Sequence, residues 1–598
     1  MNIIYYTDNK LKVKDIINAR DKLGADQYLW VYFGSDQDVL QSLVSLCGDK
    51  KRLKLGNAFH AFAREIRPKY LEYLSNLSKL NQSSVLWWAS GMASKSPFMS
   101  QFFKLVCYRE LIIKLTKQHD NLLVLIEDQS LFQTMKDSFV DGEILFVGYD
   151  QHQTIRLFVK GLKKRIWLIF YFMLIKFKII ALPEIDLRSI YNLLFSWVNP
   201  GSYKKNGKFI DYYLGDLKAY LEEKGHTAAR LTFSFFPYRQ VKDILNTQEA
   251  FIVPMKYLSF WDIIVSAATI FHFKQDDLRW FMGVDISRLL QREIFQENAN
   301  AEFIKNLIFY NGLCKIFKKS CNLRTVFHPF EGQPWEKMLA MAANEVDPKI
   351  KVYGYQHSSF ASMDLNYYLG PDEIDINPLP DIVLTNSEFN LKRLIAGGFQ
   401  SSRVASIGTL RYSHLFEHNN RAMPERENSF SVLVCLPYSS VIASEMLSEV
   451  LPVLYKVKTL GMLSKILIKP HPLVLFDFSS INGGAIAEVV SGELEEQLHD
   501  CDIMIYSNGT VGIEGLYEGK KLIKYLPELE LDLDPLAPLE NSFSIRICCR
   551  GEFNNVLPDV ISNNYSSDHR TLNMFDPVDY NKIDKLVAGR ELSQCYSQ

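Results

Sequence analysis

The stretch Ile503–Leu516, IMIYSNGTVGIEGL, decides how this chain folds and where its chemistry lies. An apolar run ends at Tyr506, a polar tetrapeptide follows, and apolar residues then recur with a helical period. This order predicts a buried strand, a short loop and a helix, the repeating unit of a parallel α/β sheet. The four loop residues are Ser507, Asn508, Gly509 and Thr510.

Two interpretations of this loop are open. In the first, backbone N–H groups and hydroxyls at the helix start bind the phosphate of a nucleotide, because a helix N-terminus favours negative charge. Glu514, four residues after Thr510, would then accept hydrogen bonds from ribose hydroxyls. In the second, the loop is an ordinary helix cap and Glu514 is a surface side chain.

The segment Lys465–Pro472, KILIKPHP, favours the phosphate interpretation. Its β-rich run is stopped by two prolines, which stiffen the loop and fix the directions of Lys469 and His471. An ammonium group and an imidazole both suit an anion, and together they would stabilise a leaving nucleotide. The alternative is a rigid turn with a single, internally satisfied histidine.

The same strand and helix rhythm extends outward and predicts two α/β units facing a cleft. A polar, charged stretch at 418–428 reads as the linker between them. We expect an N-terminal Rossmann-like domain over 1–417, with a helical, basic insertion at about 151–325, and a C-terminal Rossmann-like domain over 429–598. In the first domain, strands are predicted at 2–7, 28–34, 85–89, 122–127, 144–149, 324–330, 351–357, 381–386 and 403–408, and one in the insertion at 230–238.

Composition limits the functional classes. The chain has 598 residues and a net charge of -1, which gives no overall electrostatic case for binding nucleic acid. Its nine cysteines are scattered, so neither a disulfide framework nor structural zinc is predicted. The motifs of P-loop NTPases, NAD enzymes and zincins are absent, and Asp532-Leu533-Asp534 reads as a solvated acidic loop, so we expect no metal. The amino-terminal sequence has no signal-peptide pattern, which indicates a cytoplasmic protein.

A basic, aromatic helix is predicted near the middle of the chain. Residues 151–183 hold seven cations and no acid, and the apolar run Ile166–Ile175 is too short for the roughly 20 residues of a membrane span. The stretch 156–178 is either a helix lying on an anionic membrane surface or a buried helix between domains with solvated ends.

Two further loops follow predicted strands and face the expected cleft. They lie in Phe327–Glu336, FHPFEGQPWE, and Lys351–Phe360, KVYGYQHSSF. Glu331 is the stronger candidate for a general base, and His357 is the alternative. Gln356 and Glu336 are candidate substrate-binding residues. The other interpretation is that all four tie one loop to the next.

These motifs resemble bacterial GT-B glycosyltransferases that build surface polysaccharides such as O-antigen and capsule. KPHP followed by SNGTVGIEGL is most similar to transferases using CMP-activated acidic sugars of the sialyl, polysialyl and Kdo type, over roughly residues 350–530. EGQPWE and GYQH also resemble stretches of surface-carbohydrate transferases. The resemblance implies that His471 and the loop Ser507–Thr510 bind the nucleotide phosphate and that Glu514 holds the ribose. Related motifs occur in CDP-polyol phosphotransferases and lipid-A disaccharide synthase-like enzymes.

Two other residues complete the candidate site. Asp211 lies in an aromatic, glycine-containing loop that resembles an acidic loop of Kdo-type transferases, so it is either a nucleophile or ion-pair stabiliser, or simply an aspartate that starts a helix. Arg411, next to the linker, is a candidate phosphate ligand.

We therefore expect a metal-independent glycosyltransferase, peripheral on the inner membrane, with a CMP-linked nucleotide-sugar donor and a glycan or lipid-linked acceptor. The alternatives are a CDP-polyol phosphotransferase of the same fold and a non-catalytic assembly protein.

Overall fold

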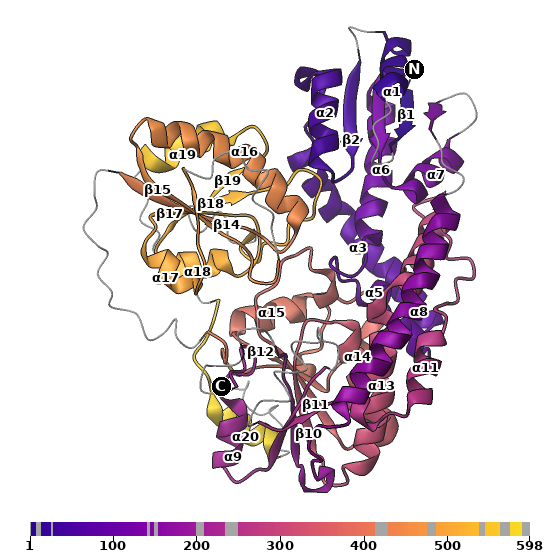
Figure 1. Ribbon diagram of the computed structural model, residues 1–598, viewed down its shortest axis with the longest axis vertical. Coiled ribbons are helices and arrows are strands. Elements are labelled where there is room, and N and C mark those ends of the chain that lie inside the picture. The colour runs from indigo at the N-terminus through magenta and orange to yellow at the C-terminus, as the bar shows by residue number, and fades with distance from the viewer. Residues whose placement is uncertain are drawn as a thin grey trace.

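The described residues form three parallel sheets (Figure 1) and one short antiparallel pair, β8 (Trp280–Phe281) with β9 (Val284–Asp285). The computed structural model describes residues 2–7, 13–24, 28–139, 144–148, 153–198, 202, 209–233, 249–412, 429–474, 486–537, 545–562 and 574–588. The predicted α/β class is confirmed, and the second and third sheets are the two Rossmann-like sheets of the expected GT-B-like arrangement. The predicted linker at 418–428 lies outside the described residues.

The first sheet has the strand order β2-β3-β1-β4. Its strands are β1 (Asn2–Tyr6), β2 (Leu29–Phe33), β3 (Leu122–Ile126) and β4 (Ile144–Val147), all at predicted positions. Helices of this part are α1 (Val13–Lys22), α2 (Gln37–Cys47), α3 (Gly56–Leu80), α5 (Gly91–Ser94), α6 (Phe102–Gln118) and α7 (Gln129–Ser138).

The strand predicted at 85–89 is wrong. Val85–Trp88 forms the short helix α4, whose N-cap Ser84 accepts a hydrogen bond from the Trp87 N–H. A short apolar run fits a buried helix as well as a strand, and Trp87 and Trp88 are both completely buried.

The second sheet has seven strands, in the order β13-β12-β11-β10-β5-β6-β7. They are β5 (Asn192–Phe195), β6 (Ala228–Leu231), β7 (Phe251–Ile252), β10 (Thr325–Pro329), β11 (Lys351–Gln356), β12 (Ile382–Thr385) and β13 (Val404–Ser406). The expectation that these later strands continue the first sheet is wrong, because β10 pairs with β5 of the predicted insertion. The insertion supplies three strands to this sheet, and β5 and β7 were missed because they are too short to show a period.

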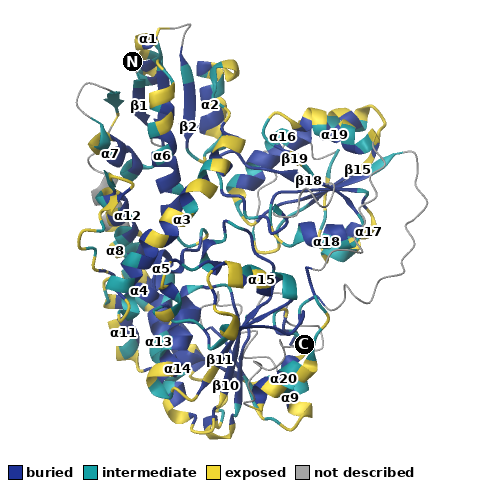
Figure 2. Cartoon of the chain, turned by 180° about the vertical axis from the view of Figure 1, so that it is seen from behind, coloured by how far each residue is buried: buried dark blue, intermediate teal, exposed yellow. Residues whose placement is uncertain are grey.

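The third sheet has six strands, in the order β16-β15-β14-β17-β18-β19. They are β14 (Phe430–Cys435), β15 (Leu463–Lys469), β16 (Glu488–Val489), β17 (Ile503–Tyr506), β18 (Lys521–Tyr525) and β19 (Arg546–Cys548). The strand-loop-helix expected at 503–516 is confirmed as β17 and α18 (Val511–Tyr517). The other helices are α16 (Ser440–Thr459), α17 (Leu494–His499) and α19 (Phe553–Ser562), and Figure 2 shows the central strands between them as buried.

Helices on two faces cover the seven-stranded sheet. On one side lie α8 (Gln153–Ile179), α11 (Phe260–Ala268), α12 (Ser287–Ala299), α13 (Ala301–Lys319) and α14 (Pro334–Val346), which share one large hydrophobic core. On the other side, α9 (Leu217–Glu223) packs with α20 (Tyr580–Val587). The last described segment therefore returns to the seven-stranded sheet, although it belongs to the stretch predicted as the C-terminal domain.

The loop after β18 attaches the third sheet to the amino-terminal part. Glu528 accepts hydrogen bonds from the Arg52 guanidinium and from the Leu55 N–H, the latter at 3.1 Å. Both side chains of the Arg52–Glu528 pair are 6% exposed. Leu529 and Leu531 enter the same core as α3 and α6.

We expect Glu528→Ala to destabilise the protein by about 3–5 kcal/mol, because it leaves the Arg52 charge buried without its partner. Urea unfolding followed by tryptophan fluorescence measures this change. Asp137→Ala, which removes an Arg288 ion pair whose side chains are 53% and 48% exposed, is the control and should cost about 0–1 kcal/mol. Equal losses in the two variants would contradict the role given to this loop.

Candidate functional site

Glu331 and His357 meet where β10 and β11 end. The His357 Nε2 lies 3.2 Å from the Glu331 Oε1, and the His357 side chain is only 2% exposed. The ring of Tyr213 packs edge-on against this imidazole, with centroids 4.7 Å apart. Because the strands are parallel, these loops leave the same edge of the sheet.

The charges around this pair set its protonation. Burial lowers the pKa of His357 below 6.5, against the opposite effect of Glu331, so the imidazole is neutral at neutral pH. Burial acts to raise the pKa of Glu331, but the hydrogen bond from His357 and the charge of Arg411 outweigh it and lower that pKa overall. A neutral imidazole facing a carboxylate carries its proton on Nε2. Its buried Nδ1, which has no partner among the described residues, is left as an acceptor.

Glu336 shapes the loop that carries Glu331. Its carboxyl accepts hydrogen bonds from the backbone N–H groups of Glu331 and Gly332, each at 2.9 Å. Gly332 has φ of +67°, and a Cβ there would lie 2.4 Å from the Asn366 carbonyl oxygen. These contacts match the interpretation of Glu336 as a loop-tying residue.

Gln356 is completely buried at the end of β11. Its Nε2 donates to the Ser358 carbonyl, while its Oε1 has no hydrogen-bond partner among the described residues. The side chain holds the loop and retains one free acceptor.

Arg411 lies between the seven-stranded and six-stranded sheets. Its guanidinium carbon is 5.6 Å from the ring centre of Tyr213 and 5.0 Å from that of Tyr412. The Tyr412 hydroxyl donates to the Thr510 Oγ1 at 3.1 Å, which connects the two units. No role for these two tyrosines was predicted from the sequence. Tyr412 directly follows Arg411, and Tyr213 lies two positions after Asp211.

Asp211 has four hydrogen-bond donors around its carboxylate. Arg230 and Ser196 donate to its Oδ2 at 2.8 and 2.6 Å, and the N–H groups of Tyr213 and Leu214 donate to its Oδ1. This arrangement favours the structural interpretation of Asp211, which fixes the turn that carries Tyr213 to His357.

The loop between β17 and α18 presents a buried hydroxyl, that of Ser507, which no described residue engages. Ser507 is 2% exposed, and its hydroxyl has no partner among the described residues. Gly509 has φ of +92°, and a Cβ there would meet no atom within 4 Å, so the backbone borders open space. Thr510 makes no side-chain capping bond to the helix. Burial raises the pKa of Glu514 to about 7, and Arg411 acts in the opposite direction.

Lys469 ends β15 and His471 follows it, at the same edge of the sheet. The Lys469 ammonium donates to the Gly492 carbonyl, which leaves two of its N–H groups. The His471 Nδ1 accepts from the Leu473 N–H at 3.3 Å, and burial lowers its pKa, so its Nε2 carries the proton as a donor. The Tyr438 ring stands edge-on to this imidazole at 5.4 Å.

The two predicted phosphate-binding loops therefore flank a single strand. β14 pairs with β15 on one side and with β17 on the other, all in parallel. At a strand spacing of about 4.8 Å, the ends of β15 and β17 lie about 10 Å apart. Cys435 is the last residue of β14. Burial raises the pKa of its thiol, and the charges of Lys469 and Glu514 act on that pKa in opposite directions.

The acidic residues around Asp532 and Asp534 in the sequence predict a solvated loop. The structure places both in a buried ion-pair cluster instead. Asp534 is completely buried, and both carboxylates pair with the Lys524 ammonium, at 2.9 and 3.3 Å. The described residues contain no group of three or more histidine, cysteine or acidic side chains arranged for a metal ion.

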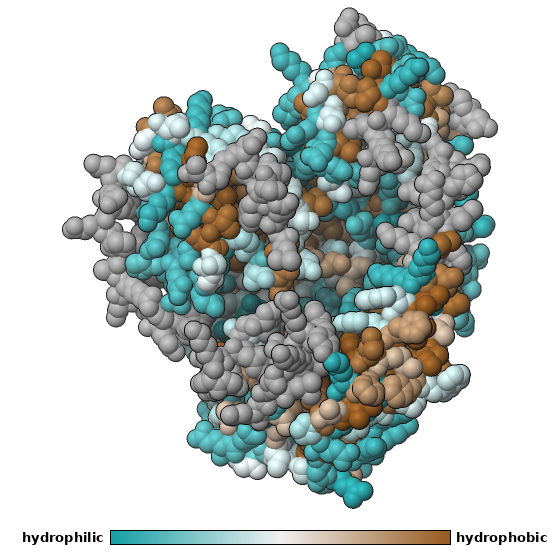
Figure 3. Space-filling model, in the orientation of Figure 1, coloured by the Kyte–Doolittle hydropathy of each residue, from teal (hydrophilic) through white to brown (hydrophobic). Residues whose placement is uncertain are grey.

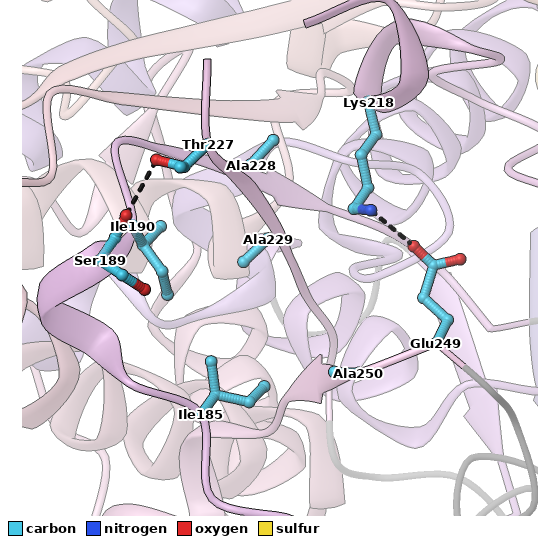
Figure 4. A pocket seen from close by; sticks show the side chains of 9 residues that line it. All are labelled: Ile185, Ser189, Ile190, Lys218, Thr227, Ala228, Ala229, Glu249 and Ala250. Atoms are coloured by element: carbon cyan, nitrogen blue, oxygen red, sulfur yellow. Dashed lines mark hydrogen bonds and ion pairs between the residues drawn. The ribbon is translucent and has the colours of Figure 1, made fainter. Parts of the chain in front are cut away.

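A pocket of about 200 Å³ lies elsewhere, at the amino-terminal edge of the seven-stranded sheet (Figure 4). Alanine and isoleucine side chains line much of it, and the Lys218–Glu249 ion pair borders one side. Since the candidate residues occupy the opposite edge, this pocket belongs to a different part of the molecule.

No protein-family model matches this chain, and no curated protein matches its sequence. Similar solved structures include the UDP-GlcNAc 2-epimerase of Methanocaldococcus jannaschii in complex with UDP-GlcNAc and UDP, with 9% identity and a TM-score of 0.41, covering 67% of this chain and 100% of that one. The calicheamicin glycosyltransferase CalG4 has 11% identity and a TM-score of 0.37, covering 68% and 99%. A likeness this distant does not decide the activity or ligand of this chain.

We expect the His357 imidazole to titrate below pH 6.5 and to carry its proton on Nε2, because burial disfavours the imidazolium. Glu331→Gln should lower the pKa further, since it removes the carboxylate that opposes burial. Nitrogen NMR of 15N-histidine-labelled protein, assigned with His357→Asn, measures both. A pKa above 6.5, or a proton on Nδ1, would contradict the geometry described.

Proposed function

We propose that this protein is a glycosyltransferase that moves a sugar from a nucleotide-sugar donor to a glycan or lipid-linked acceptor. The observation that carries the proposal is the meeting of two sets of polar residues from two parallel sheets. One set contains Glu331, His357 and Arg411, and the other contains Ser507 and Thr510, joined to the first through Tyr412. Open α/β sheets bind ligands at this edge of their strands.

The acceptor hydroxyl is activated by the Glu331–His357 pair. The lone pair of the His357 Nδ1 takes the hydroxyl proton as the acceptor oxygen bonds to the anomeric carbon. Glu331 accepts from the Nε2–H and stabilises the imidazolium that forms. His357, rather than Glu331, is then the general base.

The leaving nucleotide is stabilised on the six-stranded sheet. As the bond between the anomeric carbon and the phosphate oxygen breaks, its electron pair moves to the phosphate. The donors for this charge are the Ser507 hydroxyl, the N–H groups of Asn508 and Gly509, the His471 Nε2–H and the Lys469 ammonium. Glu514 lies one helical turn beyond Thr510, within α18, and binds the ribose.

The donor we propose is a CMP-linked acidic sugar. Arg411 supplies a cation between Tyr213 and Tyr412, suited to a carboxylate or phosphate oxygen. The choice of CMP rests on the resemblance of the KPHP and SNGT motifs, and the nucleotide experiment below tests it separately.

We expect CMP to raise the melting temperature more than UMP, GMP or ADP, because a ligand that binds only the native state stabilises it. Ser507→Ala and His471→Ala should each weaken CMP binding about tenfold by removing a hydrogen bond to a charged group. Differential scanning fluorimetry and calorimetric titration measure these changes. His499→Ala is the control, because His499 precedes β17 at the opposite edge and is exposed. Stabilisation by UMP alone would retain the transferase and reject the CMP donor, while no nucleotide binding would reject both.

We expect His357→Ala and Glu331→Gln to lower kcat about 10²–10⁴-fold without changing nucleotide affinity, because they act on the acceptor proton. Nucleotide release from CMP-, UDP- and GDP-sugars, measured with purified protein, reports this loss. Glu223→Gln, on the exposed end of α9, is the control.

Mass spectrometry of the product separates the alternatives. A polyol phosphotransferase would carry phosphorus into the polymer, whereas a glycosyltransferase would not. Unchanged polysaccharide synthesis in His357→Ala and Glu331→Gln would instead indicate a non-catalytic assembly protein.

A further inference from the structure

Helix α8 has two apolar faces, of which only one is buried. Leu168, Phe172, Ile175 and Ile179 recur at helical spacing and are at most 4% exposed, against the core. A second set recurs at the same spacing on the opposite side of the helix and is open to solvent: Val159, Leu162, Ile166, Phe170, Leu174 and Phe177, from 44% to 72% exposed. The alternative of a buried helix between domains with solvated ends therefore does not hold, because one face is exposed along the middle of the helix as well.

Helix α11 extends the exposed face. It packs beside α8, where the Arg165 guanidinium donates to the Thr269 carbonyl at 2.8 Å. Trp261 and Val265, four residues apart, are 70% and 47% exposed, and Ile270 just beyond the helix is 63% exposed. Figure 3 shows hydrophobic side chains gathered along this side of the molecule. Figures 1 and 2 place α8 and α11 on the side away from the six-stranded sheet.

The charges beside these apolar side chains are positive. Lys163 and Lys178 each follow an exposed apolar residue by four positions, so they stand on the same side of α8, and both are exposed. Asp262, the acid in the first turn of α11, is neutralised by Lys315 and by hydrogen bonds from Ser259. Between residues 151 and 183 the sequence has no acid.

Length and composition decide how such a face meets a bilayer. No helix among the described residues is long and apolar enough to cross a membrane. Leucine and phenylalanine on one face, an exposed tryptophan and flanking lysines are the features of helices that lie in the interface plane, with lysines reaching the headgroup phosphates.

We propose that α8 and α11 together form a docking face for an anionic lipid bilayer, with Phe170, Leu174, Phe177 and Trp261 entering the acyl boundary. The proposal commits to lipid because the exposed cations beside the apolar side chains match anionic headgroups. It stands independently of the proposed function, because membrane binding needs no substrate.

Vesicle flotation with the full-length protein tests this face. Wild type should float with vesicles of phosphatidylcholine containing 30% phosphatidylglycerol, chosen as the test composition, and float much less with phosphatidylcholine alone. Phe170→Glu/Phe177→Glu should reduce the partition coefficient at least about tenfold, and Lys163→Glu/Lys178→Glu should reduce it by a similar factor. Leu460→Glu is the matched control, because Leu460 is 67% exposed at the end of α16 in the six-stranded unit.

The variants change exposed side chains, so melting temperature and nucleotide binding should equal those of wild type. A wild type that does not float, or floats equally with and without anionic lipid, overturns the proposal. A dimer in sedimentation velocity that Phe170→Glu/Phe177→Glu dissociates, with no vesicle binding, would assign the face to a second copy instead.

Discussion

The parallel direction of the strands is the constraint on which the rest of the structure depends. Side chains that follow strands far apart in the chain leave two sheets at their carboxyl-terminal edges, where the Tyr412 hydroxyl donates a hydrogen bond to Thr510. No single segment contains the site. Its geometry therefore depends on the contacts that hold the sheets in place, among them the Arg52–Glu528 pair, which attaches the six-stranded sheet to the amino-terminal part, and the leucines beside it.

Several buried polar atoms at this edge have no partner among the described residues. They are the Ser507 Oγ, the His357 Nδ1 and the Gln356 Oε1. Leaving a buried polar group unpaired costs about 1–3 kcal/mol. A ligand that pairs with these atoms recovers that free energy on binding. Groups that destabilise the protein by itself therefore stabilise its complex with the ligand.

Sequence patterns predicted the individual strands and helices better than they predicted which strands share a sheet. The run ending at Tyr506 and the prolines after Lys469 are local signals, and the strands they predicted are present. Which strands share a sheet depends on pairing between distant segments, so the separation of β1 from β10 had no local sign. For Asp211 and Glu336 the sequence left two roles open, because the hydrogen bonds by which each carboxylate supports a neighbouring loop show only in three dimensions.

Arg411 lies near two carboxylates whose pKa values are shifted in opposite directions, although its own charge acts to lower both. Its charge, with the His357 hydrogen bond, holds the pKa of Glu331 below its usual value, whereas burial raises the pKa of Glu514 to about 7 despite Arg411. Two carboxylates whose pKa values are shifted in opposite directions are suited to two different chemical tasks. Glu331 stays ionised beside the His357 imidazole, while Glu514 can exchange a proton near neutral pH. An anion bound at Arg411 would weaken its positive field and so raise the pKa values of both carboxylates.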